Sequence, residues 1–170
     1  MYTKVISIGR TFLLSQIFVP VAAFAIPFVL SGPQILVGTL VNSILFYTAK
    51  KLDQKFLWAV AALPSLGALI HGVLFANFTP FLLYFLPFIW LGNMVLIKTF
   101  RSINGVLPVK VVVSAIFKTL ILYLSALLYF NMSIVPQLFL TSMGMIQLIT
   151  ALFGGALAIL VLGIFNERSR

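Results

Sequence analysis

Long apolar stretches alternate with short basic clusters along this chain. Three stretches carry no charged residue, namely 11–49, 56–97 and 119–166, and they contain 39, 42 and 48 residues. A helix needs about 20 residues to cross the ~30 Å apolar core of a bilayer. Each stretch is therefore long enough for two membrane-spanning helices.

Turn-forming residues interrupt each charge-free stretch near its middle. These interruptions are the segments 31–33 (Ser-Gly-Pro), 77–80 (Asn-Phe-Thr-Pro) and 131–136. The pattern predicts an all-α integral membrane protein in which six transmembrane helices form one domain over residues 1–170. The predicted spans are 11–30, 33–49, 56–75, 80–99, 109–130 and 143–165.

The basic residues predict how these spans cross the membrane. Except for Lys118, they lie near the N-terminus, within 50–55, within 98–110 or near the C-terminus, and the intervening turns have none. The positive-inside rule then predicts a multi-pass protein of the cytoplasmic (inner) membrane with both termini in the cytoplasm. The small-x-small motif at 23–25 also fits a cleaved leader, but the apolar run continues to Leu30 and favours a span.

The composition limits the chemistry that the chain can perform. The sequence is 62% hydrophobic and 8% charged, with Asp53 and Glu167 as its two acidic residues, one histidine and no cysteine. Soluble domains have about 25% charged residues. Paired carboxylates, thiol chemistry and metal clusters are nearly excluded, so we expect no enzymatic activity, no cofactor and no resident metal. The net charge of +9 follows from topology and does not indicate nucleic acid.

Three polar residues form a predicted intramembrane layer. Asn42, Asn93 and Lys118 each lie eight residues from a basic residue at the cytoplasmic side, which is about 12 Å along a helix. On the fifth predicted helix, Ser114, Lys118, Ser125 and Tyr129 share one face, which we expect to point into the bundle. The layer favours a latch in which the two amide oxygens accept hydrogen bonds from Lys118. Snorkelling of Lys118 to the cytoplasmic headgroups is a second structural interpretation, and both are favoured over the alternative of a proton or ligand site.

A second polar group lies toward the opposite side of the membrane. Its polar members are His71, Asn77, Gln137 and Gln147, and Tyr84 and Trp90 are its predicted aromatic walls. Apolar walls with a few polar groups are typical of small-molecule sites, so we expect these six residues to bind a ligand. An interfacial aromatic belt with a packed histidine is the alternative.

Small residues recur on the last predicted helix at spacings that allow close helix packing. They are Ala151, Gly154, Gly155 and Ala158. Such a stripe packs either within the bundle or against a partner subunit.

Five stretches, in this order, resemble the membrane-embedded substrate-binding (S) component of energy-coupling factor (ECF) transporters: SGPQILVGTLVNSILF, ALPSLGALIHGVLF, LPFIWLGNMVLIKTF, FKTLILYLSALLYF and MIQLITALFGGALA. The resemblance covers about residues 15–160. It is closest to a small uncharacterised bacterial group of that type that is sometimes labelled "iron hydrogenase". Such iron chemistry conflicts with the lack of cysteine.

The resemblance implies a six-helix bundle that captures a small nutrient, such as a vitamin or a metal ion, from the outer face. It also implies a transmembrane coupling protein and two cytoplasmic ATPases as partners, which would hydrolyse ATP. The family's first helix typically carries an Ala-xxx-Ala pair for docking, whereas Ala22, Ala23 and Ala25 lack that spacing. The scarcity of acidic residues favours an anionic or neutral ligand over a cation. The alternative function is that of a non-transporting structural or assembly subunit that uses the small-residue stripe as its contact face.

Overall fold

The computed structural model describes residues 2–30, 32–72 and 76–167, with the side chains of 16–30, 32–72 and 77–163. The described part is helical and contains no strand, which confirms the all-α prediction. Its α-helices are α1 (Tyr2–Val29), α2 (Gln34–Lys51), α3 (Leu57–His71), α4 (Leu82–Ser102), α5 (Leu107–Asn131), α6 (Leu138–Met143) and α7 (Met145–Glu167). Two 3₁₀ helices, η1 (Gln54–Phe56) and η2 (Ala76–Phe81), precede α3 and α4.

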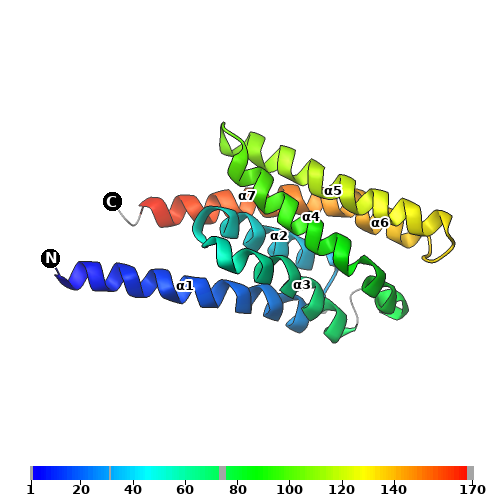
Figure 1. The fold of residues 1–170 in the computed structure, drawn as a ribbon, viewed down its shortest axis with the longest axis horizontal. Helices are drawn as coiled ribbons and strands as arrows, with labels where there is room; N and C mark the ends of the chain where they lie inside the picture. Colours follow the sequence, from blue (N-terminus) through cyan, green and yellow to red (C-terminus); the bar gives the residue numbers. More distant parts are fainter. Residues whose placement is uncertain (1, 31, 73–75, 168–170) are drawn as a thin grey trace.

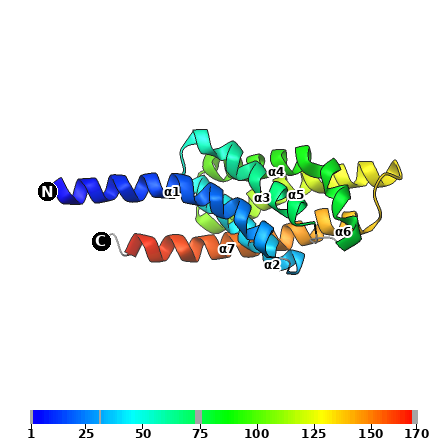
Figure 2. The ribbon, with the colours of Figure 1, turned by 90° about the horizontal axis from the view of Figure 1, so that it is seen from below.

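The long helices run alternately in opposite directions (Figure 1). We call one end of the bundle the basic end: α1 begins there, α7 ends there, and the α2–α3 and α4–α5 connections lie there (Figures 1 and 2). The α1–α2, α3–α4 and α5–α6 connections lie at the other end, which we call the far end. Lys50, Lys55 and Arg101 therefore gather at one end of the molecule, as the sequence pattern requires.

The most extensive helix contacts pair α2 with α7, α1 with α3 and α4 with α5. α1 contacts α3 much more than it contacts α2, its neighbour in the sequence. Glycines explain this preference, because they let backbones approach closely. A side chain at Gly67 of α3 would collide with the carbonyl oxygen of Phe24 in α1, and one at Gly154 of α7 would lie 2.6 Å from the Cβ atom of Asn42 in α2.

The ends of two helices differ from the predicted spans for local reasons. The third helix stops at His71 because Gly72 adopts a left-handed conformation (φ 78°) and its N–H bonds to the carbonyl of Ala68, a common helix C-cap. Residues 73–75 of the predicted span lie outside the described residues. The last span is preceded by the short helix α6, and Gly144 separates the two helices.

Three segments of the described chain are long and apolar enough to cross a membrane. They are Asn77–Ser102, Leu107–Asn131 and Leu138–Gly163, and Gln16–Val29 is a shorter apolar helix. One face of α5 is exposed and apolar, with Phe117, Leu120 and Leu124 each about half exposed. Large exposed apolar surfaces of this kind mark contact with lipid or protein, so the exterior is compatible with a bilayer.

The buried apolar residues form two separate clusters. One lies toward the basic end and includes Phe46, Leu96 and Ala115; the other lies toward the far end and includes Phe85, Leu122 and Phe139. On α5 the predicted inward face is confirmed, since Ser114, Lys118 and Ser125 are at most 4% exposed and Tyr129 is half-buried. Lys118 lies between the two clusters, where the polar layer interrupts the core.

Candidate functional site

A cavity of about 80 Å³ lies beside the far-end apolar cluster, whose members Ala68, Leu82 and Met143 line it. By the same measure a single water needs about 10–15 Å³, so the cavity has room for a small molecule. Together with its part open to solvent, the empty space is about 570 Å³. The lining comes from all seven α-helices: Pro27, Gln34, Val37, Gly38, Val41, Asn42, Pro64, Ser65, Ala68, Leu82, Ile89, Asn93, Lys118, Met143 and Gln147.

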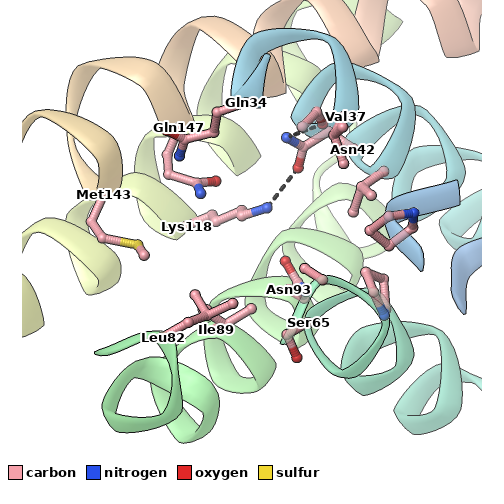
Figure 3. Close-up of a pocket in the computed structure, with 15 residues that line it drawn as sticks. Gln34, Val37, Asn42, Ser65, Leu82, Ile89, Asn93, Lys118, Met143 and Gln147 are labelled. Atoms are coloured by element: carbon pink, nitrogen blue, oxygen red, sulfur yellow. Dashed lines mark hydrogen bonds between the residues drawn. The ribbon is translucent and has the colours of Figure 1, made fainter. Parts of the chain in front are cut away.

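The cavity occupies the half of the bundle toward the far end. Gln34 and Leu82 are the first residues of α2 and α4, Met143 is the last of α6, and Ala68 lies in the last turn of α3. Asn42, Asn93 and Lys118 lie deeper, toward the middle of their helices. They form the polar floor of a cavity with mostly aliphatic walls (Figure 3).

Lys118 is the cation of this floor, and its side chain is 3% exposed. Its Nζ atom donates a hydrogen bond of 2.6 Å to the Oδ1 atom of Asn42. The Nδ2 atom of Asn42 in turn donates to the carbonyl of Gly38 (2.9 Å) and to the hydroxyl of Thr150 (3.2 Å). Since both donated bonds hold the Asn42 amide nitrogen away from Lys118, the amide oxygen is the atom that faces the ammonium.

Small residues on neighbouring helices make this geometry possible. A Cβ atom at Gly38 would lie 3.0 Å from the Cγ2 atom of Thr150, so glycine lets α2 and α7 approach where Asn42 meets Thr150. A Cβ atom at Gly92 of α4 would lie 3.5 Å from the Cγ atom of Lys118. The backbone of α4 therefore packs directly on the lysine side chain, which helps to exclude other positions for it.

Asn93 provides a hydrogen-bond acceptor on the other side of the cavity, opposite the donor Lys118. Its Nδ2 atom donates to the carbonyl of Ala61 (2.8 Å), while its buried Oδ1 atom has no hydrogen-bond partner among the described residues. The expected latch is therefore half formed, because the oxygen of Asn42 accepts from Lys118 and that of Asn93 does not. A buried acceptor without a donor is rare and calls for an explanation, such as a ligand or a water.

Trp90 contacts the cavity only indirectly, through the lining residue Ser65. It was expected to form a wall, but it does not line the space. Its Nε1 atom donates to the hydroxyl of Ser65 (2.8 Å), which lines the cavity and itself donates to the carbonyl of Ala62 (2.8 Å). Trp90 therefore holds Ser65 in place and joins α4 to α3.

Gln147 is the predicted ligand contact that reaches the cavity directly. Within the described part of the chain its side-chain amide makes no hydrogen bond, so it is available to a ligand. Gln34, at the start of α2, also lines the cavity, and its Nε2 atom donates to the carbonyl of Ser142 (3.1 Å). No pattern in the sequence indicates this long-range bond from Gln34 to α6.

The other predicted ligand residues do not line the cavity. His71 Nδ1 lies 2.6 Å from the carbonyl oxygen of Phe28, a hydrogen bond that joins the ends of α3 and α1. Asn77 and Gln137 are exposed, and Tyr84 is half exposed, with its carbonyl accepting from the hydroxyl of Tyr129 (3.2 Å). These four residues lie near the far end and are not gathered around one space with Gln147.

The small-residue stripe packs inside the bundle. Ala151, Gly154, Gly155 and Ala158 are all buried. A side chain at Gly155 would collide with Val111 of α5, and one at Gly154 would meet α2. In the folded chain this stripe is therefore occupied by α2 and α5 and is closed to a partner subunit.

The electrostatics of the cavity are dominated by Lys118. Asp53, whose carboxylate is the single acidic side chain in the described part, is exposed and lies in the connection between α2 and α3 at the basic end. The described residues also hold no group of three or more potential metal ligands among His, Cys, Asp and Glu. The buried ammonium that faces the cavity therefore has no anionic partner among the described side chains.

Comparison of the chain with protein-family models, with curated proteins and with solved structures found no match.

Proposed function

We propose that this protein is the membrane-embedded substrate-binding component of an ECF-type nutrient uptake transporter, and that it captures a small molecule from the outer face. One observation carries the proposal: Lys118 faces a cavity that all seven α-helices line, and so does the Asn93 oxygen, which has no hydrogen-bond partner among the described residues. Sites for small molecules commonly combine mostly apolar walls with a few converging polar groups.

The distribution of charge supports an orientation for this binding site. We place six spans across the membrane with the basic end, including Lys50, Lys98 and Lys110, in the cytoplasm. The cavity lies toward the far end, so this orientation directs it to the outside. A site near the outer surface suits capture, because the solute reaches it without first crossing the bilayer.

The fold also supports a role that depends on partners. The structure offers a binding cavity, and the sequence has no phosphate-binding loop that could hydrolyse a nucleotide. We therefore assign energy coupling to a transmembrane coupling protein and two cytoplasmic ATPases. Since Ala22, Ala23 and Ala25 lack the family's docking spacing, the surface that meets the coupling protein differs from the family pattern.

A ligand screen on the purified protein tests the capture function. The protein in lipid nanodiscs is heated with vitamins, other small metabolites and divalent metals, and the midpoint of thermal unfolding is measured. A ligand that binds only the folded state raises this midpoint. We expect at least one compound to do so, and the shift to disappear in Gln147→Ala but not in Asn104→Ala, an exposed control in the α4–α5 connection. The proposal fails if no compound stabilises the protein.

Purification from native membranes tests the partners separately. Recovery of the chain with ATPases and a second membrane protein supports the transporter. Recovery with an unrelated membrane complex, together with no response in the ligand screen, supports a structural or assembly subunit instead.

A further inference from the structure

We infer that the cavity selects a small aliphatic organic anion that carries a hydroxyl or N–H donor beside its anionic group. The inference rests on the proposed function only in that the cavity receives a solute. It is argued from the hydrogen-bonding capacity left unused at Lys118 and Asn93.

The anionic group follows from Lys118. A buried charge is costly unless it is paired. The described residues give this ammonium one neutral acceptor, the Asn42 oxygen, and no carboxylate. An anionic oxygen in the cavity supplies the missing counter-charge, whereas a cation is repelled.

The ammonium also has free donors for that oxygen. A lysine side chain carries three N–H donors, and Asn42 accepts one of them. Figure 3 shows the Lys118 side chain between Gln147 and Gln34 on one side and Asn93 and Ser65 on the other. The remaining N–H groups can therefore bind a carboxylate that enters the space between these side chains.

The donor on the ligand follows from Asn93. The bond from Asn93 Nδ2 to the carbonyl of Ala61 fixes which end of the amide faces away from α3. The buried Oδ1 atom has no donor within the part of the chain that the structure describes, and it borders the same cavity as Lys118. A ligand hydroxyl or N–H satisfies this oxygen, and a ligand without one leaves it unpaired.

The walls of the cavity limit the size and shape of the rest of the ligand. Val37, Val41, Leu82 and Ile89 are aliphatic, and the described lining residues include no aromatic ring on which a planar group could stack. With about 80 Å³ of internal space, the cavity suits a short branched alkyl group better than a large ring system. A small hydroxy acid is the simplest molecule with all three features.

Three matched probes test the inference by titration calorimetry on the folded protein in nanodiscs. They are 2-hydroxy-3-methylbutanoate, its primary amide, and 3-methylbutanoate, which lacks the hydroxyl group. We expect the hydroxy acid to bind most tightly. The amide should bind roughly tenfold or more weakly, because it loses a hydrogen bond between charged groups, and 3-methylbutanoate several-fold more weakly, because it leaves the Asn93 oxygen unpaired.

Variants of the lining residues show which side chain is responsible for each binding preference. Lys118→Met should remove the preference for the acid over the amide, and Lys98→Met, an exposed lysine at the basic end, should retain it. Asn93→Leu should bind the two acids equally. If Lys118→Met does not fold, Gln147→Glu provides the test, because it places a carboxylate at the cavity without removing a hydrogen bond seen in the described residues, and it should weaken acid binding.

Two results overturn the inference. One is equal binding of the amide and the hydroxy acid, and the other is no binding of the hydroxy acid to wild-type protein. If a neutral nutrient from the larger screen still raises the unfolding midpoint of the wild-type protein and not that of Gln147→Ala, the capture function stands, and only the assignment of an anionic ligand fails.

Discussion

The Nζ atom of Lys118 and the Oδ1 atom of Asn42 lie 2.6 Å apart, although 76 positions separate the two residues in the chain. The bond joins α5 to α2 at the floor of the cavity, and Thr150 extends it to α7. A single hydrogen-bonded chain therefore connects three helices at the level where the apolar core is interrupted.

Breaking the hydrogen bond between Lys118 and Asn42 should destabilise the bundle. Asn42→Leu leaves the ammonium without its acceptor, so we expect a loss of about 2 kcal/mol in the free energy of unfolding. The double variant Asn42→Leu with Lys118→Met should be less destabilised than the sum of the single variants, since the uncompensated charge is gone. Reversible unfolding in mixed micelles measures both quantities.

Thr119→Val provides the matched control on α5. The Thr119 hydroxyl is buried without a hydrogen-bond partner in the described part of the chain, so its removal should leave the stability equal or higher. Additive effects in the Asn42 and Lys118 double variant would contradict a structural role for their bond.

The close packing of α7 on α2 should make Gly154 intolerant of any side chain. In Gly154→Ala the new methyl group would lie 2.6 Å from the Asn42 Cβ atom and 2.7 Å from the Thr39 carbonyl oxygen, so we expect a loss of about 2 kcal/mol or more. Gly163→Ala on the same helix has open space, and it should gain up to about 1 kcal/mol from helix propensity. Equal stability of the two variants in thermal unfolding would refute this packing.

Arg101 should stabilise the junction of α2 and α4 through its planar shape. Its guanidinium donates to the carbonyls of Thr48 (3.1 Å), Ala49 (2.9 Å) and Leu52 (2.5 Å) at the end of α2. Lysine keeps the charge but cannot present this fork of donors. We therefore expect Arg101→Lys to lower the free energy of unfolding by about 1–2 kcal/mol, and Lys98→Arg, at an exposed position, to have no effect. If Arg101→Lys left the free energy of unfolding unchanged, the positive charge alone would be sufficient to stabilise this junction.

The proposed orientation can be tested by labelling, because the chain has no native cysteine. Met132→Cys lies at the exposed far end and Asn104→Cys at the exposed basic end. In intact cells a membrane-impermeant maleimide should label the first variant and not the second, and permeabilised cells should label both. The reverse pattern would place the cavity toward the cytoplasm.

Features that depend on composition and on single helices could be predicted from the amino-acid sequence. Charge-free stretches and basic clusters predicted the helical bundle with its basic residues at one end, and depth counting brought Asn42, Asn93 and Lys118 to one level. The inward face of α5 followed from helical spacing alone. These properties are local, because helix periodicity and rise relate residues a few positions apart.

How the polar groups meet could not be predicted in this way, because it depends on the packing of the helices against one another. Gln147 and Lys118 belong to predicted groups at different depths, yet they line one cavity, while His71, Asn77 and Gln137 lie outside it. Which residues share a cavity depends on how each helix is rotated and which neighbour it packs against. Contacts between distant segments set that rotation, such as Gly154 against Asn42, and no pattern within a single helix encodes them.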